Sequence, residues 1–205
     1  AMLKLYYLPG ACSLVPHTAL EWIGVDFDAQ AVDHTIIKSP EYLALNPNGQ
    51  VPLLQEGSWT LTQNVAILDY LNDVYPQAKL YGSGDARAVA RAREWLAFLN
   101  ADLHKAFSLI FGAARFSEDE SVQNAVRQAA SAQALTLLAR TDRALAGQDY
   151  LAGERTIADV YLYVILRWAY ALKLDLSGMS ALPGFFGRIE ADAGVQAALK
   201  QQGLL

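Results

Sequence analysis

The sequence predicts an α+β fold with two domains, a β-α-β-α-β-β-α domain followed by an all-helical domain. Short apolar runs separated by glycine and proline turns fill residues 1–76, whereas long segments with helical periodicity fill residues 85–205. Between them, residues 77–84 contain Gly and Ser without a periodic pattern, as a linker does. A chain of 205 residues, 53% of them apolar, is long enough to give each domain a core.

The first domain is expected to alternate strands and helices. We predict strands over 3–8 and 27–32, a hairpin of strands over 51–54 and 58–61, helices over 13–22 and 63–75, and a short helix opened by Ser39-Pro40. Gly24 stops the first helix, and Pro76 ends the last one. The hairpin turns at Glu56-Gly57.

The second domain is expected to contain only helices, over 85–112, 121–146, 156–172, 182–191 and 194–201. The helix over 156–172 has the clearest pattern, because its apolar residues fall on one stripe: Ile157, Val160, Tyr161, Val164, Ile165 and Trp168. Thr156 and Asp159 form a capping-box-like start, with Asp in place of the usual Glu.

Composition and charge exclude several classes of protein. The formal net charge is −5 and no dense Lys/Arg run is present, which disfavours binding to nucleic acid or to an anionic membrane. No apolar run is long enough to span a bilayer, and the opening run Leu3–Leu8 is too short for a signal-peptide core. The single cysteine, Cys12, cannot form an internal disulfide, so we expect a reducing, cytoplasmic location. With three histidines and no cysteine cluster, we expect no metal site.

Cys12 is the first candidate for chemistry. It follows a strand and the Pro9-Gly10 turn and stands at the start of a helix, whose free N–H groups and dipole favour a thiolate, so we expect a lowered pKa. In a thioredoxin-like domain this is the position of the reactive thiol. A redox pair would need a second cysteine where this chain has Val15, so any disulfide chemistry must use an external thiol. The alternative is that Cys12 is a small buried hydrophobe.

Two neighbours of Cys12 have alternative interpretations. Ser13 is either a helix N-cap or a hydroxyl beside the same anion site, and it can serve as both. Tyr7, near the end of the first strand, either stabilises a thiolate or packs as a core aromatic residue.

Two further segments of the first domain suggest a peptide-like ligand. A proline inside a strand pattern cannot donate to the sheet, and a cis Val51-Pro52 bond would free the Val51 backbone to pair with an extended ligand. Gln63 and Asn64 precede a helix whose first N–H groups suit a carboxylate, and their side chains suit an α-amino acid group. The plain alternatives are an edge-strand proline and a pair of helix caps.

In the second domain, His104-Lys105 lies among apolar and aromatic residues of the long first helix. A histidine in such surroundings is more often structural, and a functional role would require its helix to face Cys12. Trp168 is a core residue by default.

Together these residues resemble the bacterial beta class of cytosolic glutathione transferases along nearly the whole chain. The resemblance rests on Leu5-Tyr6-Tyr7-Leu8-Pro9-Gly10-Ala11-Cys12-Ser13, Asn46-Pro47-Asn48-Gly49-Gln50-Val51-Pro52, Thr62-Gln63-Asn64-Val65-Ala66-Ile67, Leu103-His104-Lys105, Thr156-Ile157-Ala158-Asp159 and Leu166-Arg167-Trp168-Ala169-Tyr170. The Cys-Ser start and the His-Lys pair are fairly specific to this class, whereas the other motifs are shared by many transferase classes. The resemblance implies a homodimer with one glutathione per subunit.

The resemblance also implies a role for individual residues. Cys12, Ser13 and His104 would be catalytic, with Cys12 and His104 at the glutathione sulfur. The other glutathione-binding residues would be Val51, Pro52, Gln63, Asn64, Lys105, Lys38 and Asp102, and the hydrophobic co-substrate pocket would include Trp168, Phe107 and Leu8.

The chain departs from the family pattern at three places. Gln63-Asn64 stands where beta-class members commonly have Glu followed by Ser or Gly. The loop after the second strand is short, which leaves Lys38 as the nearest candidate for the glycine carboxylate. Ala97 stands near the place of an Asn that reaches the neighbouring subunit, so Asn100 and Asp102 are alternatives.

The expected activity is conjugation of the glutathione thiolate to a small hydrophobic electrophile, with detoxification as one compatible role. Glutathione-dependent disulfide reductase or peroxidase activity is compatible with the same site. Two rivals stay open: a thiol-disulfide reductase in which Cys12 is the nucleophile, and a non-catalytic binding protein of the same fold.

Overall fold

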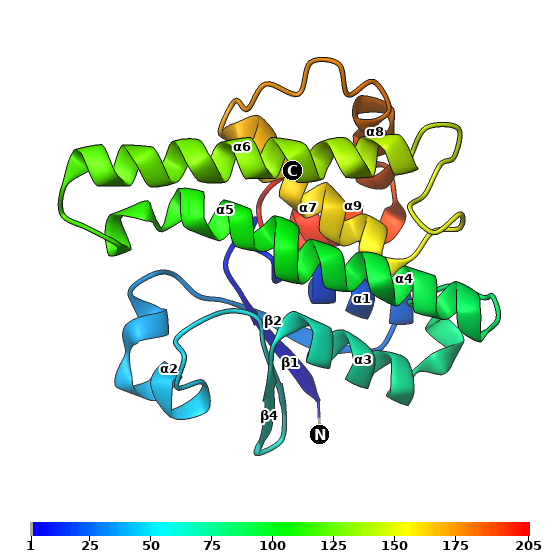
Figure 1. Cartoon of the computed structure of the whole chain (residues 1–205). Coiled ribbons are helices and arrows are strands. Elements are labelled where there is room, and N and C mark those ends of the chain that lie inside the picture. The colour runs from blue at the N-terminus through cyan, green and yellow to red at the C-terminus, as the bar shows by residue number, and fades with distance from the viewer. Residues whose placement is uncertain (1) are drawn as a thin grey trace. The chain divides into compact units, whose positions relative to one another are not determined.

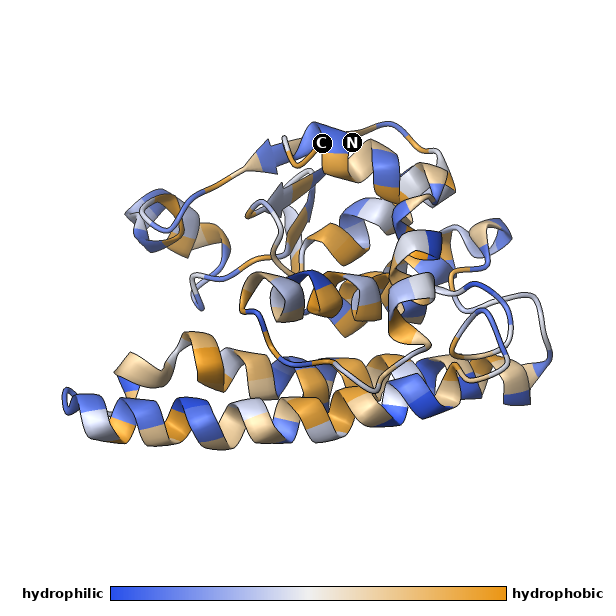
Figure 2. Cartoon of the chain, turned by 90° about the horizontal axis from the view of Figure 1, so that it is seen from above, coloured by the Kyte–Doolittle hydropathy of each residue, from blue (hydrophilic) through white to orange (hydrophobic). Residues whose placement is uncertain are grey.

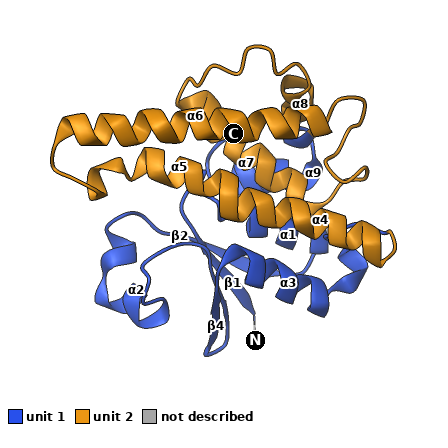
Figure 3. Ribbon diagram, in the orientation of Figure 1, with its two compact units in different colours: residues 1–83, 189–205 blue, residues 84–188 orange. Residues whose placement is uncertain are grey.

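The computed structural model describes residues 2–205, which form two compact units. Of the described residues, the first unit contains 2–83 and 189–205, and the second contains 84–188 (Figure 3).

The first unit has the order β-α-β-α-β-β-α expected of a thioredoxin-like domain, followed by a C-terminal helix (Figure 1). Its elements are β1 (Leu3–Tyr7), α1 (Leu14–Ile23), β2 (Phe27–Ala31), η1 (Ile36–Lys38), α2 (Pro40–Leu45), β3 (Leu53–Glu56), β4 (Trp59–Thr62), α3 (Asn64–Val74), η2 (Pro76–Ala78) and α9 (Ala193–Gln201). The sheet order is β2-β1-β3-β4, with β1 and β2 parallel and the other pairs antiparallel. The predicted fold of this domain is confirmed.

The two faces of the sheet differ because side chains alternate along β1. Leu3, Leu5 and Tyr7 are buried, and the Tyr7 ring lies 5.5 Å from the His17 ring of α1. On the opposite face, Tyr6 packs edge-on against Tyr42 of α2. Polar contacts complete that second face.

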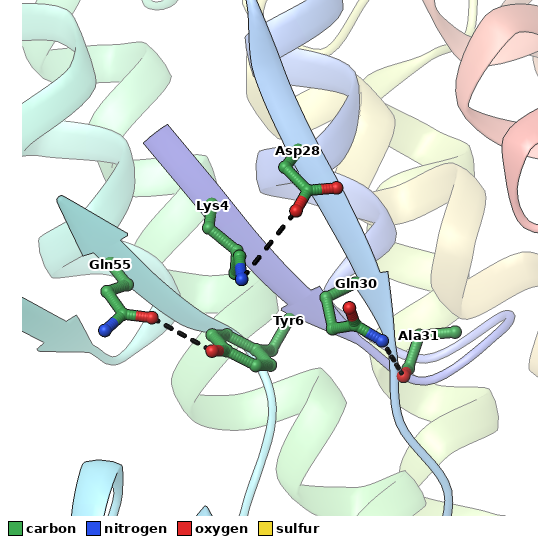
Figure 4. Close-up of polar contacts among 6 residues, drawn as sticks. All are labelled: Lys4, Tyr6, Asp28, Gln30, Ala31 and Gln55. Atoms are coloured by element: carbon green, nitrogen blue, oxygen red, sulfur yellow. Dashed lines mark hydrogen bonds and ion pairs between the residues drawn. The ribbon is translucent and has the colours of Figure 1, made fainter. Parts of the chain in front are cut away.

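Figure 4 shows these polar contacts at the strands. The Tyr6 hydroxyl donates to Gln55 Oε1 at 2.9 Å, and Lys4 pairs with Asp28 at 3.8 Å. Exposed ion pairs of this kind contribute little to stability. These contacts mark the polar part of this face, beside the apolar cluster in which Tyr6 packs against Tyr42.

The C-terminal helix α9 packs along α1, within the first unit. The Trp22 indole donates to Asp192 Oδ2 at 2.8 Å, and Gln202 Oε1 accepts the Gly10 N–H at 3.0 Å. The predicted boundary, which assigned all of residues 85–205 to the helical domain, therefore needs correction for residues 189–205. Helical periodicity reports that a segment is a helix, but not which unit its apolar stripe covers.

The second unit is helical throughout, as expected. Its elements are α4 (Ala86–Phe98), a π-helical segment η3 (Leu99–Leu103), α5 (His104–Phe111), η4 (Ala113–Arg115), α6 (Glu120–Ala144), α7 (Ile157–Ala171) and α8 (Leu182–Glu190), whose last residues reach the first unit. The helix predicted over 85–112 thus contains a π-helical turn directly before His104. Among the helices of residues 2–205, none is both long and apolar enough to cross a membrane.

Burial differs strongly between the two longest helices of this unit. Along α6 hydrophilic and hydrophobic residues alternate (Figure 2), and its buried positions form the narrow stripe Ala130, Ala134, Leu138 and Thr141. In α7, by contrast, every residue from Ile157 to Leu166 is buried. Helix α7 is therefore the centre of the second unit.

The start of α7 is held by the predicted capping box. Asp159 is fully buried, and its two oxygens accept the N–H groups of Leu151 (2.9 Å) and Thr156 (2.8 Å). Burial raises the pKa of Asp159 to about 7, against the lowering effect of these two bonds.

Candidate functional site

Three segments of the first unit meet at Cys12. The thiol lies in the turn between β1 and α1, and Sγ donates to the Val51 carbonyl oxygen at 3.7 Å. The Cys12 carbonyl oxygen accepts from Asn64 Nδ2 at 3.3 Å and from the Val15 N–H at 3.1 Å. The turn, the loop before β3 and the start of α3 are thus joined around Cys12, a half-buried residue.

The expected lowering of the Cys12 pKa is wrong. Burial raises the pKa from its ordinary value of 9.0 to about 11, and the Asn64 side chain and the Cys12 backbone N–H offset only part of this effect. The thiol also lies outside the helix whose start was expected to stabilise a thiolate. Helix α1 begins at Leu14, so the Cys12 thiol precedes the first helical residue, and the Cys12 carbonyl satisfies the Val15 N–H. At neutral pH the Cys12 side chain is a neutral hydrogen-bond donor.

Ser13 and Tyr7 are occupied by structural contacts. Ser13 is fully buried and makes no side-chain cap; its hydroxyl accepts the Leu8 N–H at 3.2 Å and lies 3.4 Å from the Leu8 carbonyl. The Tyr7 hydroxyl donates to the Gln201 carbonyl at 3.3 Å. The structure shows Ser13 holding the turn that carries Cys12 and Tyr7 packed in the core, and a contact of either with a ligand stays a prediction.

The Val51–Pro52 peptide bond is cis, as the resemblance implied. Pro52 is buried, whereas Val51 is half-buried. Val51 and Leu8 pack against a cluster formed by Val32, Ile37, Tyr42 and Leu53. Leu8 thus supports the loop that presents Val51, and its expected place in a co-substrate pocket stays a prediction.

Gln63 and Asn64 differ from ordinary helix caps. Gln63 is exposed, caps no helix N–H, and has a φ of 75°. A non-glycine residue in this region costs of order 1–3 kcal/mol and is typical of ligand sites. Asn64 is 5% exposed, and its Oδ1 is the one buried side-chain N or O atom among residues 2–205 that has no hydrogen-bond partner.

In the second unit, His104 belongs to a hydrogen-bonded chain. His104 Nδ1 lies 2.5 Å from the Tyr161 hydroxyl, which donates to Asn100 Oδ1 at 3.1 Å. Burial, and secondarily the charge of Lys105, lowers the pKa of His104 to about 4. The imidazole is therefore neutral at neutral pH.

An aromatic cluster adjoins His104. The Trp168 ring lies 4.9 Å from the His104 ring and 5.9 Å from each of Phe107 and Phe111. Phe107 has no exposed surface, whereas Phe111, one turn further on, is 55% exposed and Trp168 is half-buried. Phe107 therefore supports this cluster from within. Its expected place in the co-substrate pocket stays a prediction, and exposed Phe111 is a further candidate.

Comparison with known proteins agrees with this arrangement. Residues 1–73 match the family model "Glutathione S-transferase, N-terminal domain", and residues 99–192 match "Glutathione S-transferase, C-terminal domain". Glutathione S-transferase GST-4.5 of Xanthomonas campestris pv. campestris is 47% identical over 203 residues, which cover 98% of this chain and 100% of that protein. The chain belongs to the glutathione S-transferase family.

Solved structures of glutathione S-transferases have the same fold as this chain. The structure of a glutathione S-transferase from Xylella fastidiosa superimposes with a TM-score of 0.93 at 46% identity, covering 99% of this chain and 100% of that one. A beta-class glutathione S-transferase from Sphingomonas chungbukensis gives 0.85 at 39% identity, covering 98% and 100%. The predicted resemblance to bacterial beta-class glutathione transferases is confirmed.

Three charged residues that the family resemblance suggested are all exposed. Lys38 ends η1 in the first unit, and Asp102 and Lys105 flank His104 in the second. A contact of any of them with glutathione stays a prediction.

Two side chains beside His104 and Trp168, Tyr161 and Phe111, were not among the predicted site residues. Tyr161 fell on the apolar stripe of its helix and was assigned to the core, although a buried tyrosine hydroxyl needs a hydrogen-bond partner and this need was the available signal. Phe111 had no signal, because the periodicity of the helix does not separate a fully buried aromatic residue from an exposed one near it.

Proposed function

We propose that this glutathione S-transferase binds glutathione on its first unit and promotes attack of the glutathione thiolate on a small aromatic electrophile. The observation that carries the proposal is the unpartnered Asn64 Oδ1. A buried amide oxygen without a hydrogen bond costs about 1–3 kcal/mol, so a ligand N–H or ammonium group there would recover that energy. The γ-glutamyl ammonium of glutathione is such a donor.

The amide orientation supports this role for Asn64. Because Nδ2 donates to the Cys12 carbonyl, exchanging the two amide atoms would put Oδ1 against another acceptor. Oδ1 is therefore the atom available to a ligand donor. We propose that exposed Gln63 contributes to the same γ-glutamyl end, and that the Val51 backbone pairs with the cysteinyl part of glutathione.

We propose that Cys12 acts as a hydrogen-bond donor to the glutathione thiolate. Its raised pKa keeps the thiol proton available for donation, and in the ligand-free chain that proton is directed to the Val51 carbonyl. The same raised pKa disfavours the rival in which Cys12 is itself the nucleophile. His104, which is neutral, is proposed to contact the glutathione sulfur, as the family resemblance implies.

Glutathione binding to an Asn64→Ala variant tests the proposal. Loss of a hydrogen bond to a charged group should weaken binding by about 10- to 100-fold in calorimetry. Asn72→Ala, the same substitution further along α3, is the matched control and should bind normally. If wild type fails to bind glutathione, the rival of a non-catalytic protein of the same fold is favoured.

A Cys12→Ala variant separates conjugation from redox chemistry. We expect conjugation of an aryl halide to be reduced and to persist, because Cys12 supplies only one of several hydrogen bonds. If glutathione-dependent disulfide reduction is lost while conjugation is unchanged, Cys12 acts in redox chemistry alone.

Exposed Phe111 and half-buried Trp168, whose rings are in contact, support an aromatic co-substrate. Phe111→Ala should therefore raise the KM for an aryl halide and leave the KM for glutathione unchanged. Equal changes in both would contradict this assignment. The homodimer and the cytoplasmic location stay predictions, and sedimentation analysis of the purified protein tests the first.

A further inference from the structure

The loop between α2 and β3 contains the only Asn-Gly pair of the chain, Asn48-Gly49. Asparagine is a thermolabile residue, and a following glycine leaves the next backbone nitrogen free of obstruction by a side chain. Asn48 is exposed, and its side-chain amide makes no hydrogen bond with any of residues 2–205. The amide is therefore free to turn toward the Gly49 nitrogen, which is the nucleophile in deamidation.

The closed turn opposes this attack. The Gly49 N–H donates to the Asn46 carbonyl oxygen at 3.0 Å, and the Asn48 N–H donates to Asn46 Oδ1 at 3.1 Å. The Gly49 nitrogen must lose its proton to attack, and in the closed turn a hydrogen bond holds that proton. Asn46 is only 1% exposed, so water does not readily replace it as the acceptor. Deamidation therefore requires local opening of the turn.

Further contacts tie the turn to its neighbours in the first unit. Asn46 Nδ2 donates to the Gln50 carbonyl oxygen at 2.8 Å, and the Tyr42 hydroxyl donates to the same oxygen at 2.6 Å. Gly49 has a φ of 59°, and a Cβ atom there would lie 2.9 Å from the Ile37 carbonyl oxygen. The Gly49 backbone thus packs directly on another segment, and the turn has no room for an additional main-chain atom.

We propose that Asn48 is a site of spontaneous deamidation by water, and that opening of the turn held by Asn46 sets the rate. Hydroxide removes the Gly49 N–H proton, and the nitrogen bonds to Asn48 Cγ. The bond from Cγ to Nδ2 breaks, and Nδ2 leaves as ammonia after taking a proton from water, which restores the hydroxide. A water molecule then opens the cyclic imide at one of its two carbonyl carbons.

The two products of ring opening should differ in their effect on the glutathione site. Opening at the side-chain carbonyl leaves aspartate, which adds a charge at an exposed position and keeps the path of the backbone. Opening at the main-chain carbonyl leaves isoaspartate, in which the backbone is longer by a methylene group. Because Gly49 packs against the Ile37 carbonyl, the longer backbone must displace the loop that presents Val51. This consequence for the site rests on the proposed function.

The modification can be measured without glutathione. Mass spectrometry of peptides from wild type incubated at mildly alkaline pH gives the rate, and an isoaspartate-specific methyltransferase distinguishes the two products. We expect deamidation at Asn48 that accelerates with pH and is slower in the folded chain than in urea. Asn48→Ser should abolish it. No deamidation at this position, or equal rates in the folded and unfolded chain, would overturn the proposal.

Variants of the loop test whether the turn sets the rate. Asn46→Ala removes the acceptor of the Asn48 N–H and should accelerate deamidation about 5-fold or more, the equivalent of one modest hydrogen bond. If this variant does not fold, Tyr42→Phe loosens the loop by removing only a hydroxyl and should also accelerate the reaction. Asn72→Ala on α3 is the control and should deamidate at the wild-type rate. Unchanged rates in both loop variants would refute the role of the turn.

Calorimetry connects the modification to the site. The separated isoaspartate form should bind glutathione about 10-fold or more weakly than wild type, whereas Asn48→Asp, which carries the same charge on a normal backbone, should bind as wild type does. Equal binding by the isoaspartate form and wild type would overturn the consequence for the site. Failure of wild type to bind glutathione would instead overturn the proposed function, and the deamidation rates would stand.

Discussion

The Cys12 thiol of the free protein should be a slow nucleophile, and this can be tested by alkylation across a range of pH. Burial raises its pKa from 9.0 to about 11. At a pH well below 9, the thiolate fraction is therefore about 100-fold smaller than that of an ordinary cysteine, which corresponds to about 2.7 kcal/mol. Since the thiolate is the reacting form, alkylation should be slowed by a similar factor.

The chain is well suited to this measurement because it has a single cysteine. Iodoacetamide labelling followed by the mass of the intact chain therefore reports Cys12 alone. We expect the logarithm of the rate to rise linearly with pH, without a plateau, through about pH 9.5. The same chain unfolded in urea is the control and should react with the pH dependence of an ordinary thiol.

The pH dependence separates the raised pKa from simple shielding. Steric shielding alone would slow the reaction equally at every pH and leave its midpoint where it is in urea. A plateau below about pH 8 would refute the reasoning, because it would mean that Cys12 is a thiolate stabilised by the start of α1. The rival reductase, with Cys12 as the nucleophile, would then be favoured.

Three further predictions concern stability, measured by urea unfolding. Asp159→Ala leaves two buried N–H groups without an acceptor and should lower the free energy of unfolding by about 2–5 kcal/mol, whereas Asp159→Asn, which keeps one acceptor, should cost less. Burial lowers the pKa of His17, whose Nδ1 accepts a hydrogen bond from Gln202 Nε2 at 2.8 Å. Because His17 of the unfolded chain therefore binds a proton more readily, the free energy of unfolding should fall as pH drops below 6.5. In His17→Asn this dependence on pH should be weaker. Ser13→Ala leaves the Leu8 N–H without its acceptor, so it should lower the free energy of unfolding by about 1–3 kcal/mol and change the KM for glutathione little. A raised KM with unchanged stability would instead indicate that Ser13 contacts the ligand.

Local patterns in the sequence were sufficient for most of the fold. Alternation in Leu3–Tyr7 and the turn at Gly57 define strands of the first unit, and Thr156 with Asp159 defines the start of α7. These signals are short in range, since they arise from neighbouring residues and from the period of each element. For the same reason they could not reveal that α9 packs on α1, or that a π-helical turn precedes His104.

The same distinction between local and tertiary information applies to the candidate site. Local patterns marked Cys12, the Val51-Pro52 pair and Asn64 as candidates, because they stand at turns and helix starts where ligands bind, whereas His104 became a candidate only through the family resemblance. Only the tertiary structure decided their chemical state: a buried thiol that is protonated, an amide oxygen without a partner, and a neutral histidine held by Tyr161. Burial and hydrogen-bond partners come from segments distant in the chain, and they determine where each proton resides.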